Sequence, residues 1–412
     1  MKIAPPCRFC ATPLQHSFCD LGMSPLSNAY LSAQDLRLPE KFYPLHAYVC
    51  ADCYLVQLEA FEAPDQIFGD YAYFSSYSQT WLDHARDYCD MMTDRLGLDA
   101  RHQVVEIASN DGYLLKNFKA RRIPVLGIEP AENVARVAQS NGIPTRVAFF
   151  GTTLARELAG KGLQADLLLG NNVLAHVPDL NDFVEGLRLL LKPGGTITME
   201  FPHLLRLMEE NQFDTIYHEH FSYFSLTTVE RIFAAHGLTI FDVDTLSTHG
   251  GSLRIYAHHT GETVPTTSKA MQQAKSMESQ KGLHTLAAYS AFGEQVKKTK
   301  RSLLTFLIGV KQAGKSVAGY GAPAKGNTLL NYCGIRQDFI DYTVDLSPHK
   351  QGKFLPGTHI PVYTPEKIRE TRPDYVLILP WNIREEIMAQ MFYIREWGGQ
   401  FVVPIPEVRV IA

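Results

Sequence analysis

Four short apolar runs in the middle of the chain set the strongest limit on its fold. They are QVVEIA at 103–108, PVLGIE at 124–129, ADLLLG at 165–170 and GTITMEF at 195–201. Segments with a helical pattern lie between them, and this alternation is typical of parallel βαβ units. We therefore predict an α/β fold with a parallel, Rossmann-like sheet in the middle of the chain.

The same alternation resumes near the C-terminus. The apolar runs there are KSVAGYG at 315–321, FIDYTVD at 339–345, DYVLILP at 374–380 and GQFVVPIP at 399–406. A polar stretch without proline at about 267–313 predicts one or two long connecting helices. We expect three regions: a cysteine- and proline-rich module at 1–70, a Rossmann-like core at 71–265, and a helical linker with a second Rossmann-like domain at 266–412.

Charge and hydrophobicity exclude several classes of partner. The chain has 412 residues and a formal net charge of −4, so it has no basic field of the kind that holds nucleic acid or anionic lipid. It has no run of about 18 apolar residues to span a membrane, and its first ten residues, MKIAPPCRFC, lack the apolar core of a signal peptide. We expect a cytoplasmic monomer that binds neither nucleic acid nor a membrane.

Two C-x-x-C pairs stand at the N-terminus, Cys7 with Cys10 and Cys50 with Cys53. Each pair can aim two sulfurs at one point, and four thiolates complete a tetrahedral zinc site. Such a closed site has no position open to substrate, so its role would be structural. Cys19, between the pairs, is a spare ligand, and buried or redox-active thiols are the alternative interpretation.

Polar residues follow the first two core strands. The segment VVEIASNDGYLL (104–115) contains one glycine, Gly112, whereas a phosphate-binding loop normally has more. An acidic loop at the carboxyl end of a first strand better suits a cationic ligand with an amino-acid tail. Glu129, at the end of the second strand, can accept both ribose hydroxyls of an adenosine, or it can simply favour a helix N-terminus.

Glu129 and the LKPGG turn (191–195) resemble the S-adenosylmethionine-dependent methyltransferases. One departure is Ala108, where that family usually has glycine. An NAD-dependent enzyme would share the ribose acid but would need the pyrophosphate glycines. The resemblance implies S-adenosylmethionine as cofactor, and the residues expected to bind it are Glu106, Ser109, Asn110, Asp111, Glu129, Pro130, Asn171 and Asn172.

The order of motifs along the whole chain is more specific. The four-cysteine module is followed by YFSSYSQTW (73–81), EIASNDGYLL (106–115), HEHFSYFS (218–225), HGGSLR (249–254) and GYGAPAKGNTLLNY (319–332). This order resembles the sugar C-methyltransferases of deoxysugar biosynthesis, similar to the tetronitrose and mycarose C-3 enzymes. The resemblance implies a nucleotide-diphosphate 4-keto-6-deoxysugar as substrate and methylation at its C3.

The stretch IYHEHFSYFS (216–225) fits that chemistry. A carbon beside a ketone becomes a nucleophile when a base removes its proton and the enolate is stabilised. Histidine suits the base because its ordinary pKa of about 6.5 keeps it largely neutral near pH 7. By resemblance the base is His220, supported by Tyr217 and Glu219. His176 is expected at the same pocket, and Tyr73 is expected in a lid over the sugar.

Purely structural interpretations of this stretch are also possible. A histidine in an apolar segment is usually a core residue, and the rings of Tyr223 and Phe224 are expected to pack. His218 shares a face with His220 only if the segment is extended. A metal site made by His218, Glu219 and His220 is an alternative, but no further ligand follows them at a recognised spacing.

The loop GYGAPAKGN (319–327) follows a strand and opens a helix, where backbone N–H groups favour phosphate. The resemblance assigns it to the substrate's diphosphate, and a tight strand–helix turn is the alternative. The rival functions are an O- or N-methyltransferase, a nucleotide-sugar oxidoreductase, and a nucleotide-sugar sensor without turnover. The expected substrate contacts are Ser76, Tyr77, His249, Arg254, Tyr320, Ala324, Lys325 and Asn327.

Overall fold

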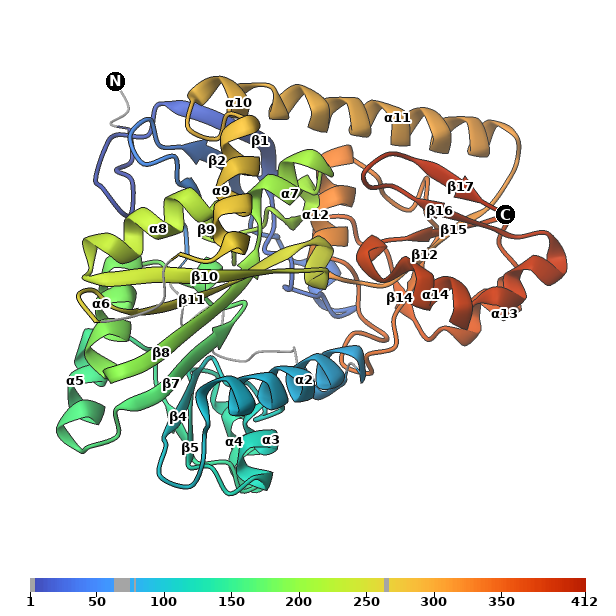
Figure 1. Cartoon of the computed structure of the whole chain (residues 1–412). Helices are drawn as coiled ribbons and strands as arrows, with labels where there is room; N and C mark the ends of the chain where they lie inside the picture. The colour runs from blue at the N-terminus through green and yellow to red at the C-terminus, as the bar shows by residue number, and fades with distance from the viewer. Residues whose placement is uncertain (1–3, 63–74, 78, 263–266) are drawn as a thin grey trace.

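The computed structural model describes residues 4–62, 75–77, 79–262 and 267–412 (Figure 1). The predicted Tyr73 lies outside the described residues, as does the side chain of Tyr77. Within the described part of the chain, every helix falls short of the length and apolarity that a bilayer-spanning segment needs.

The N-terminal module is an antiparallel sheet whose last strand comes from the core segment of the chain. Its order is β1 (His16–Ser24), β2 (Tyr43–Val49), β3 (Val56–Leu58) and β9 (Ser222–Tyr223), with a short helix η1 (Asp35–Arg37) between β1 and β2. In the last pair Val56 faces Tyr223 and Gln57 faces Ser222. The histidine-rich stretch of the core therefore continues directly into the sheet of the module.

The core is a seven-stranded sheet between helices. Its spatial order is β10 (Leu238–Leu246), β11 (Ser252–His259), β8 (Leu191–Pro202), β7 (Ala165–Asn171), β4 (Val104–Ile107), β5 (Val125–Glu129) and β6 (Thr145–Val147). The strands from β4 to β8 pair in parallel, and β11 is antiparallel to both of its neighbours. The strand order reverses at β4, so its carboxyl end and that of β7 flank the crevice where such sheets bind ligands.

Helices and single turns connect the core strands. They are η2 (Ser75–Tyr77), α2 (Gln79–Leu96), α3 (Leu115–Ala120), α4 (Glu132–Ser140), α5 (Thr152–Gly160), η3 (Leu174–His176), α6 (Leu180–Leu190), α7 (Leu204–Glu209), η4 (Phe213–Thr215), α8 (Leu226–Ala235) and η5 (Thr248–Gly250). Of the short ones, η3 follows β7 and contains the predicted His176, and η5 lies between β10 and β11 and contains the predicted His249. The third, η4, ends five residues before His220.

The C-terminal domain is a second α/β sheet. Its strand order is β14 (Val362–Tyr363), β13 (Thr343–Val344), β12 (Val317–Tyr320), β15 (Tyr375–Ile378), β16 (Gln400–Val403) and β17 (Arg409–Ile411). Its helices are α12 (Ala324–Cys333), α13 (Glu366–Thr371), η6 (Trp381–Ile383), α14 (Arg384–Gln390) and η7 (Phe392–Trp397). All pairs are parallel except β16 with β17. The order reverses at β12, so the segment after it and η6, which follows β15, lie at the same edge.

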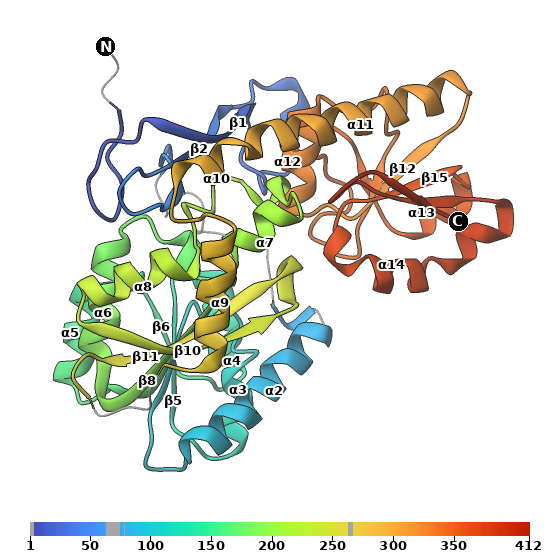
Figure 2. The same cartoon turned by 45° about the horizontal axis from the view of Figure 1, so that its top comes forward.

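Three helices join the core to this domain: α9 (Lys269–Gln280), α10 (Leu286–Ser290) and α11 (Phe292–Gln312). The buried positions of α11, such as Val296, Leu303 and Leu307, recur at helical spacing and form one apolar face. Figures 1 and 2 show α11 running from the N-terminal module to the C-terminal domain. The ring of Phe18 on β1 stacks on Phe292 at 4.6 Å, and the module and the C-terminal domain share one hydrophobic core.

Candidate active site and metal centre

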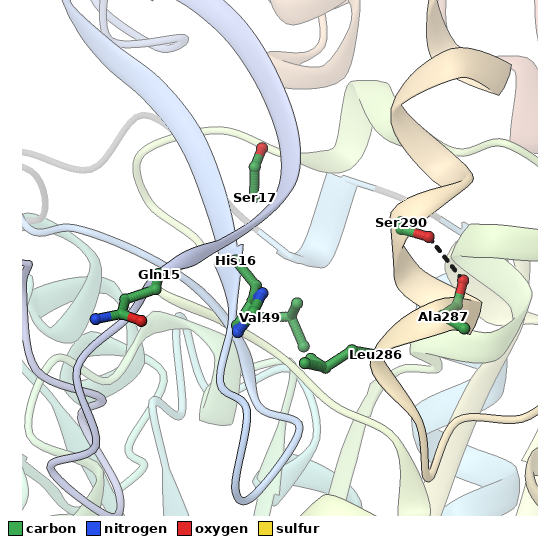
Figure 3. A pocket seen from close by; sticks show the side chains of 7 residues that line it. All are labelled: Gln15, His16, Ser17, Val49, Leu286, Ala287 and Ser290. Atoms are coloured by element: carbon green, nitrogen blue, oxygen red, sulfur yellow. Dashed lines mark hydrogen bonds between the residues drawn. The ribbon is translucent and has the colours of Figure 1, made fainter.

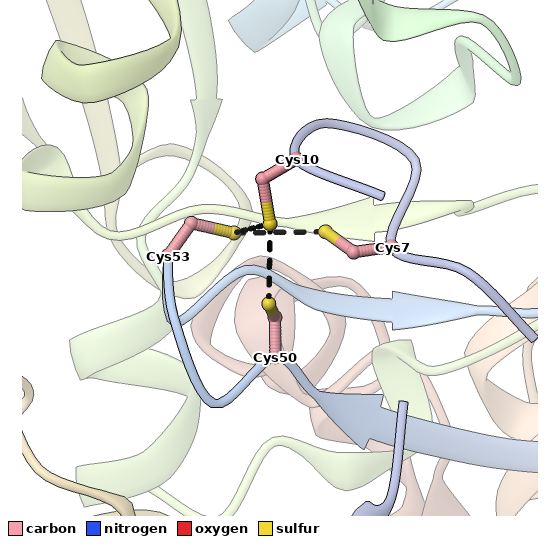
Figure 4. Close-up of side chains that lie close together, drawn as sticks. All are labelled: Cys7, Cys10, Cys50 and Cys53. Atoms are coloured by element: carbon pink, nitrogen blue, oxygen red, sulfur yellow. Dashed lines mark hydrogen bonds between the residues drawn. The ribbon is translucent and has the colours of Figure 1, made fainter. Parts of the chain in front are cut away.

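Four cysteines converge at one end of the N-terminal module. The Sγ atoms of Cys7, Cys10, Cys50 and Cys53 all lie within 4.8 Å of one another (Figure 4). The Cys7 and Cys53 sulfurs are 3.6 Å apart, and those of Cys10 and Cys50 are 3.5 Å apart. Four thiolates around a tetrahedral zinc ion, with Zn–S bonds of about 2.3 Å, are roughly 3.8 Å from each other. The arrangement therefore fits a closed structural zinc site.

The surroundings of the cluster support the same assignment. The side-chain amide of Gln57 donates to the Cys7 sulfur at 3.1 Å, as partners of zinc thiolates commonly do. Cys19 is not in the cluster: it is 2% exposed, it packs in the core that the module shares with the C-terminal domain, and burial raises its pKa to about 12. Among the described residues, the four cysteines are the only group of three or more side chains arranged to hold a metal.

The turn after β4 has an unusual backbone. Ala108, Asn110 and Gly112 have φ values of 54°, 50° and 79°. Glycine adopts these angles without penalty, whereas alanine does so at a cost of about 1–2 kcal/mol. This explains why methyltransferases usually have glycine where this chain has Ala108. The turn bends the chain sharply back from the sheet edge and brings its polar side chains over β5.

Glu129 closes this turn. Its two carboxylate oxygens accept from the backbone N–H groups of Asn110 and Ala131, each at 2.9 Å. Burial raises the pKa of Glu129, and these two N–H groups oppose the shift. Pro130 sits between the carboxylate and Ala131, at the entrance to α4. The acid therefore has a structural role in addition to any ribose contact.

Glu106 is the least satisfied group at this edge. It is 1% exposed, and neither carboxylate oxygen has a hydrogen-bond partner among the described residues. Burial, followed by the charges of Glu129 and Asp111, raises its pKa well above the ordinary value. Other buried oxygens nearby without such a partner are Ser109 Oγ, Asp111 Oδ1 and Asn172 Oδ1. An acidic set of unsatisfied acceptors is suited to a ligand that carries positive charge, as S-adenosylmethionine does.

The segment before the core lies directly on this turn. The backbone N–H of Ser75 donates to Asn110 at 2.9 Å, and the backbone N–H of Ser76 donates to Asp111 at 3.2 Å. The hydroxyl of Ser76 donates to the same carboxylate. The structure thus places Ser76, predicted as a substrate contact, on the predicted cofactor loop.

Two hydrogen bonds fix the ring of His220. Its Nδ1 is 3.0 Å from the carbonyl oxygen of Thr215, and its Nε2 is 2.9 Å from the hydroxyl of Tyr217. A carbonyl only accepts, so Nδ1 carries the proton and Nε2 keeps a lone pair toward which Tyr217 donates. Burial, followed by the charge of His176, lowers the pKa of His220 well below its ordinary value. The ring is therefore neutral near pH 7.

His176 completes a pair of imidazoles. Its ring centroid is 4.7 Å from that of His220, with the planes at 74°. The backbone N–H of Phe221 donates to the carbonyl of Ala175 at 2.7 Å and holds the two segments together. Burial lowers the pKa of His176 to about 4. Because η3 begins three residues after Asn171, the last residue of β7, this contact connects His220 to the edge of the sheet at which the cofactor loop lies.

The neighbours of His220 point elsewhere. Residues 218 and 219 form a turn, so the extended arrangement that would align His218 with His220 does not occur. His218 Nε2 donates to the carbonyl of Pro44 at 3.2 Å. Glu219 accepts from Asn28 at 2.6 Å, and burial raises its pKa to about 7. Asn28, in the N-terminal module, was not predicted, and no sequence pattern marks it.

His249 approaches from the other side of β8. Its backbone φ is 54°, and its Nε2 is 2.9 Å from the Asn172 side-chain nitrogen. Burial and then the charge of Lys325 lower the pKa of His249 to about 4. The ring of Trp81 meets it edge-on at 5.2 Å. His249 thus lies between the carboxyl end of β7 and the C-terminal domain.

Arg254 is engaged inside the core. It is 4% exposed, donates to Glu200 at 2.8 Å and lies over the ring of Tyr88 at 4.6 Å. Glu200 also accepts from the hydroxyl of Thr248 at 2.9 Å. The guanidinium therefore pairs with a carboxylate that also holds η5, and the substrate contact expected for Arg254 stays a prediction.

Lys325 meets the core at η4. Its ammonium group donates to Asn382 at 2.8 Å and lies 4.6 Å from the ring centroid of Trp381. The indole N–H of Trp381 donates to Asp214 at 2.7 Å. Burial raises the pKa of Asp214 to about 6, and the charge of Lys325 opposes that shift. Asp214, Trp381 and Asn382 were not predicted from the sequence, although the last two directly follow the predicted strand at 374–380.

The other residues of the predicted nucleotide loop face protein groups. Tyr320 donates to Gln390 at 3.1 Å, and the side-chain amide of Asn327 donates to the carbonyl of Ser27 at 2.5 Å. Ala324 is the first residue of α12, directly after Pro323. Ala324 and the backbone of the first turn of α12 remain the part of this loop suited to a phosphate.

Two cavities lie away from these groups. One of about 420 Å³ is lined by Gln15, His16 and Val49 of the module and by Leu286 and Ser290 of α10 (Figure 3). The other, of about 310 Å³, is lined by residues of the segment before β2, including Leu26, Leu38 and Glu40, together with Tyr43 and Glu62. Neither contains a predicted cofactor or catalytic residue.

Comparison with known proteins places the chain in a family. It is 37% identical over 409 residues to the C-methyltransferase NovU of Streptomyces niveus, covering 98% of this chain and 96% of the relative. Family models match three regions: a zinc binding domain at 7–68, a methyltransferase domain at 81–243, and a C-methyltransferase C-terminal domain at 247–406. The chain belongs to the C-methyltransferase family. It is an S-adenosylmethionine-dependent enzyme with an N-terminal zinc site.

More distant likenesses cover a smaller share of the chain. The ubiquinone biosynthesis O-methyltransferase of Bartonella tribocorum is 28% identical over 94 residues, which is 23% of this chain and 38% of the relative. The crystal structure of the PH0226 protein from Pyrococcus horikoshii OT3 is 16% identical, covers 49% of this chain and all of that one, and has a TM-score of 0.38.

Proposed function

We propose that this C-methyltransferase methylates C3 of a nucleotide-diphosphate 4-keto-6-deoxysugar. The observation that carries the proposal is the state of His220: a neutral, half-buried imidazole whose Nδ1–H is held by Thr215 and whose Nε2 keeps its lone pair. A carbon beside a ketone must lose a proton to such a base before it can attack. Oxygen and nitrogen nucleophiles already carry a lone pair and depend less on a base.

The proposed reaction moves one proton and one methyl group. His220 Nε2 takes the proton from C3, and the electron pair of that bond passes into a C3–C4 double bond while the carbonyl oxygen becomes an enolate. Tyr217 donates to Nε2 in the resting site, and either its hydroxyl or the ring of His176 can then face the oxyanion. S-adenosylmethionine supplies an electrophilic methyl group. C3 would take this methyl group as the carbonyl re-forms, and the electron pair of the broken C–S bond would stay on the sulfur.

The acidic edge at β4 and β5 would hold the cofactor. We assign its cationic amino-acid end to Glu106 and Asp111 and its ribose to Glu129, with Ser109 and Asn172 supplying further acceptors. The unsatisfied buried oxygens support this assignment, because each gains a partner only when a donor enters.

The nucleotide end would face the C-terminal domain. The first turn of α12 offers backbone N–H groups to a diphosphate, as helix N-termini do. That turn lies beside η4 of the core, which precedes the His220 segment, so one substrate can contact both domains.

Substrate labelled with deuterium at C3 tests the proposal. With S-adenosylmethionine, the expected product gains a methyl group and loses the deuterium, because carbon methylation replaces that atom. A methylated product that retains the deuterium would show an O- or N-methyltransferase instead. A change at the nicotinamide absorbance band with added NAD would point to the oxidoreductase.

A further inference from the structure

Among the described residues, no carboxylate contacts the ammonium group of Lys325. This lysine lies in the first turn of α12 and is half-buried. Burial lowers its pKa, and the negative charge of Asp214 opposes that shift from beyond contact distance. Among the described residues its ammonium group has one hydrogen-bond acceptor, Asn382, and the face of Trp381, but no carboxylate within salt-bridge distance. A partly enclosed ammonium with N–H groups to spare is suited to an anion.

Trp381 fixes where this cation stands. Its indole N–H bonds to Asp214, whose neighbour Thr215 holds His220. The same ring packs on Gly250, next to His249: a Cβ on Gly250 would be only 2.7 Å from the ring. The ammonium group over this ring therefore stands where η4 and η5 meet, between the segments that carry the two histidines.

The electrostatics agree with this position. The charge of Lys325 contributes to the lowered pKa of His249, where it is the largest cause after burial, and to that of His220. The direction of both shifts agrees with an ammonium group that stands between the two segments. An anion in the same space would feel the opposite, favourable interaction.

We propose that Lys325 binds the oxyanion that forms when His220 deprotonates the substrate, so that the C-terminal domain completes the active site of the core. The proposal rests on the proposed function. The proton leaves C3 for His220, the negative charge collects on the carbonyl oxygen, and the ammonium group offsets it without being consumed. When the carbonyl re-forms, the charge on oxygen disappears and the product can leave.

The substrate's diphosphate is a second anion that the same ammonium group could bind. The contacts favour the enolate, because Lys325 is tied through Trp381 to the segments of His220 and His249, whereas the N–H groups of the α12 turn are available to the phosphates. The two possible anions predict different effects when the charge of Lys325 is removed: loss of proton exchange for the enolate, and loss of nucleotide affinity for the diphosphate.

The test measures exchange of the C3 proton in heavy water, followed by proton NMR, with thymidine diphosphate 4-keto-6-deoxyglucose as probe and S-adenosylhomocysteine in place of the donor. Lys325→Met removes the charge and keeps the length of the side chain. Lys311→Met, which removes a lysine of α11 paired with Asp341, is the control. At saturating probe, we expect exchange by Lys325→Met to fall on the order of 10²–10³-fold, as for loss of an oxyanion donor. Affinity for thymidine diphosphate should stay at the wild-type value.

Exchange at the wild-type rate overturns the inference, and a loss of thymidine diphosphate affinity with normal exchange assigns Lys325 to the diphosphate. Wild-type enzyme that fails to exchange this proton refutes the proposed function instead. Should Lys325→Met not purify as folded protein, Lys325→Gln replaces it. In either variant the acid limb of the exchange rate should move to higher pH, because the base loses a nearby positive charge; an unmoved limb contradicts the inference.

Discussion

Replacing Glu106 by glutamine should change stability and cofactor affinity in opposite directions. Glu106 places two acceptor oxygens in the protein interior without partners among the described residues, beside Glu129 and Asp111. Folding must either bury the charge of Glu106 or hold its carboxyl protonated, and the neutral amide avoids this cost although its own polar atoms stay buried. Each unit by which the pKa is raised corresponds to about 1.4 kcal/mol. We expect Glu106→Gln to stabilise the cofactor-free protein by about 1–3 kcal/mol, while binding S-adenosylmethionine about 10–100-fold more weakly, since a charge-assisted hydrogen bond contributes roughly 1.5–3 kcal/mol.

Thermal unfolding and titration calorimetry measure the two effects. The pKa of Glu106 is raised in the folded protein, so folding favours its protonated form; the wild type should lose stability as pH rises from the unfolded value of about 4.3 toward the folded pKa, and the variant should not. Binding a cation should release a proton from Glu106, which makes the wild-type binding enthalpy depend on the buffer. Glu132→Gln, on the exposed start of α4, is the control. A variant that is less stable and binds normally would refute this reasoning.

Three further changes should affect stability. Glu278, 1% exposed, accepts from His203 at 2.7 Å and from the backbone of Leu226 at 2.5 Å, so Glu278→Ala should cost about 3–5 kcal/mol in urea unfolding. These bonds lower the pKa of Glu278, so its contribution is present above about pH 4.3 and should be lost in the wild type as pH falls toward the folded pKa; a normal urea midpoint would contradict this. Cys50→Ser should abolish stoichiometric zinc by metal analysis and lower Tm, and full zinc content would refute the four-thiolate site. Ala108→Gly should relieve the left-handed backbone and add about 1 kcal/mol, which an unchanged Tm would exclude.

Most of the sheet framework could be predicted because buried parallel strands are apolar throughout. Each run from QVVEIA to GTITMEF contains or overlaps a core strand. The polar 267–313 stretch is helical as expected, but it contains three helices instead of one or two. The cysteine cluster could also be predicted, because C-x-x-C spacing directs two sulfurs to one point by local geometry alone.

What could not be predicted depends on contacts between distant segments. Strand β9 has two residues and exists because it pairs with β3, more than 160 positions earlier. The sequence cannot show that Arg254 faces Glu200, nor that a turn at 218–219 separates His218 from His220. Trp381 joins the site only because the C-terminal domain docks on η4.

The measurement that most directly tests the account is exchange of the sugar C3 proton by His220→Ala, compared with the wild type. The probe sugar nucleotide is incubated in heavy water with S-adenosylhomocysteine, and cofactor affinity is measured in parallel by calorimetry. The account predicts that the wild type exchanges the C3 proton, that His220→Ala loses most of this exchange, by roughly 10²–10⁴-fold, and that both proteins bind the cofactor equally. Exchange by His220→Ala at the wild-type rate would contradict it.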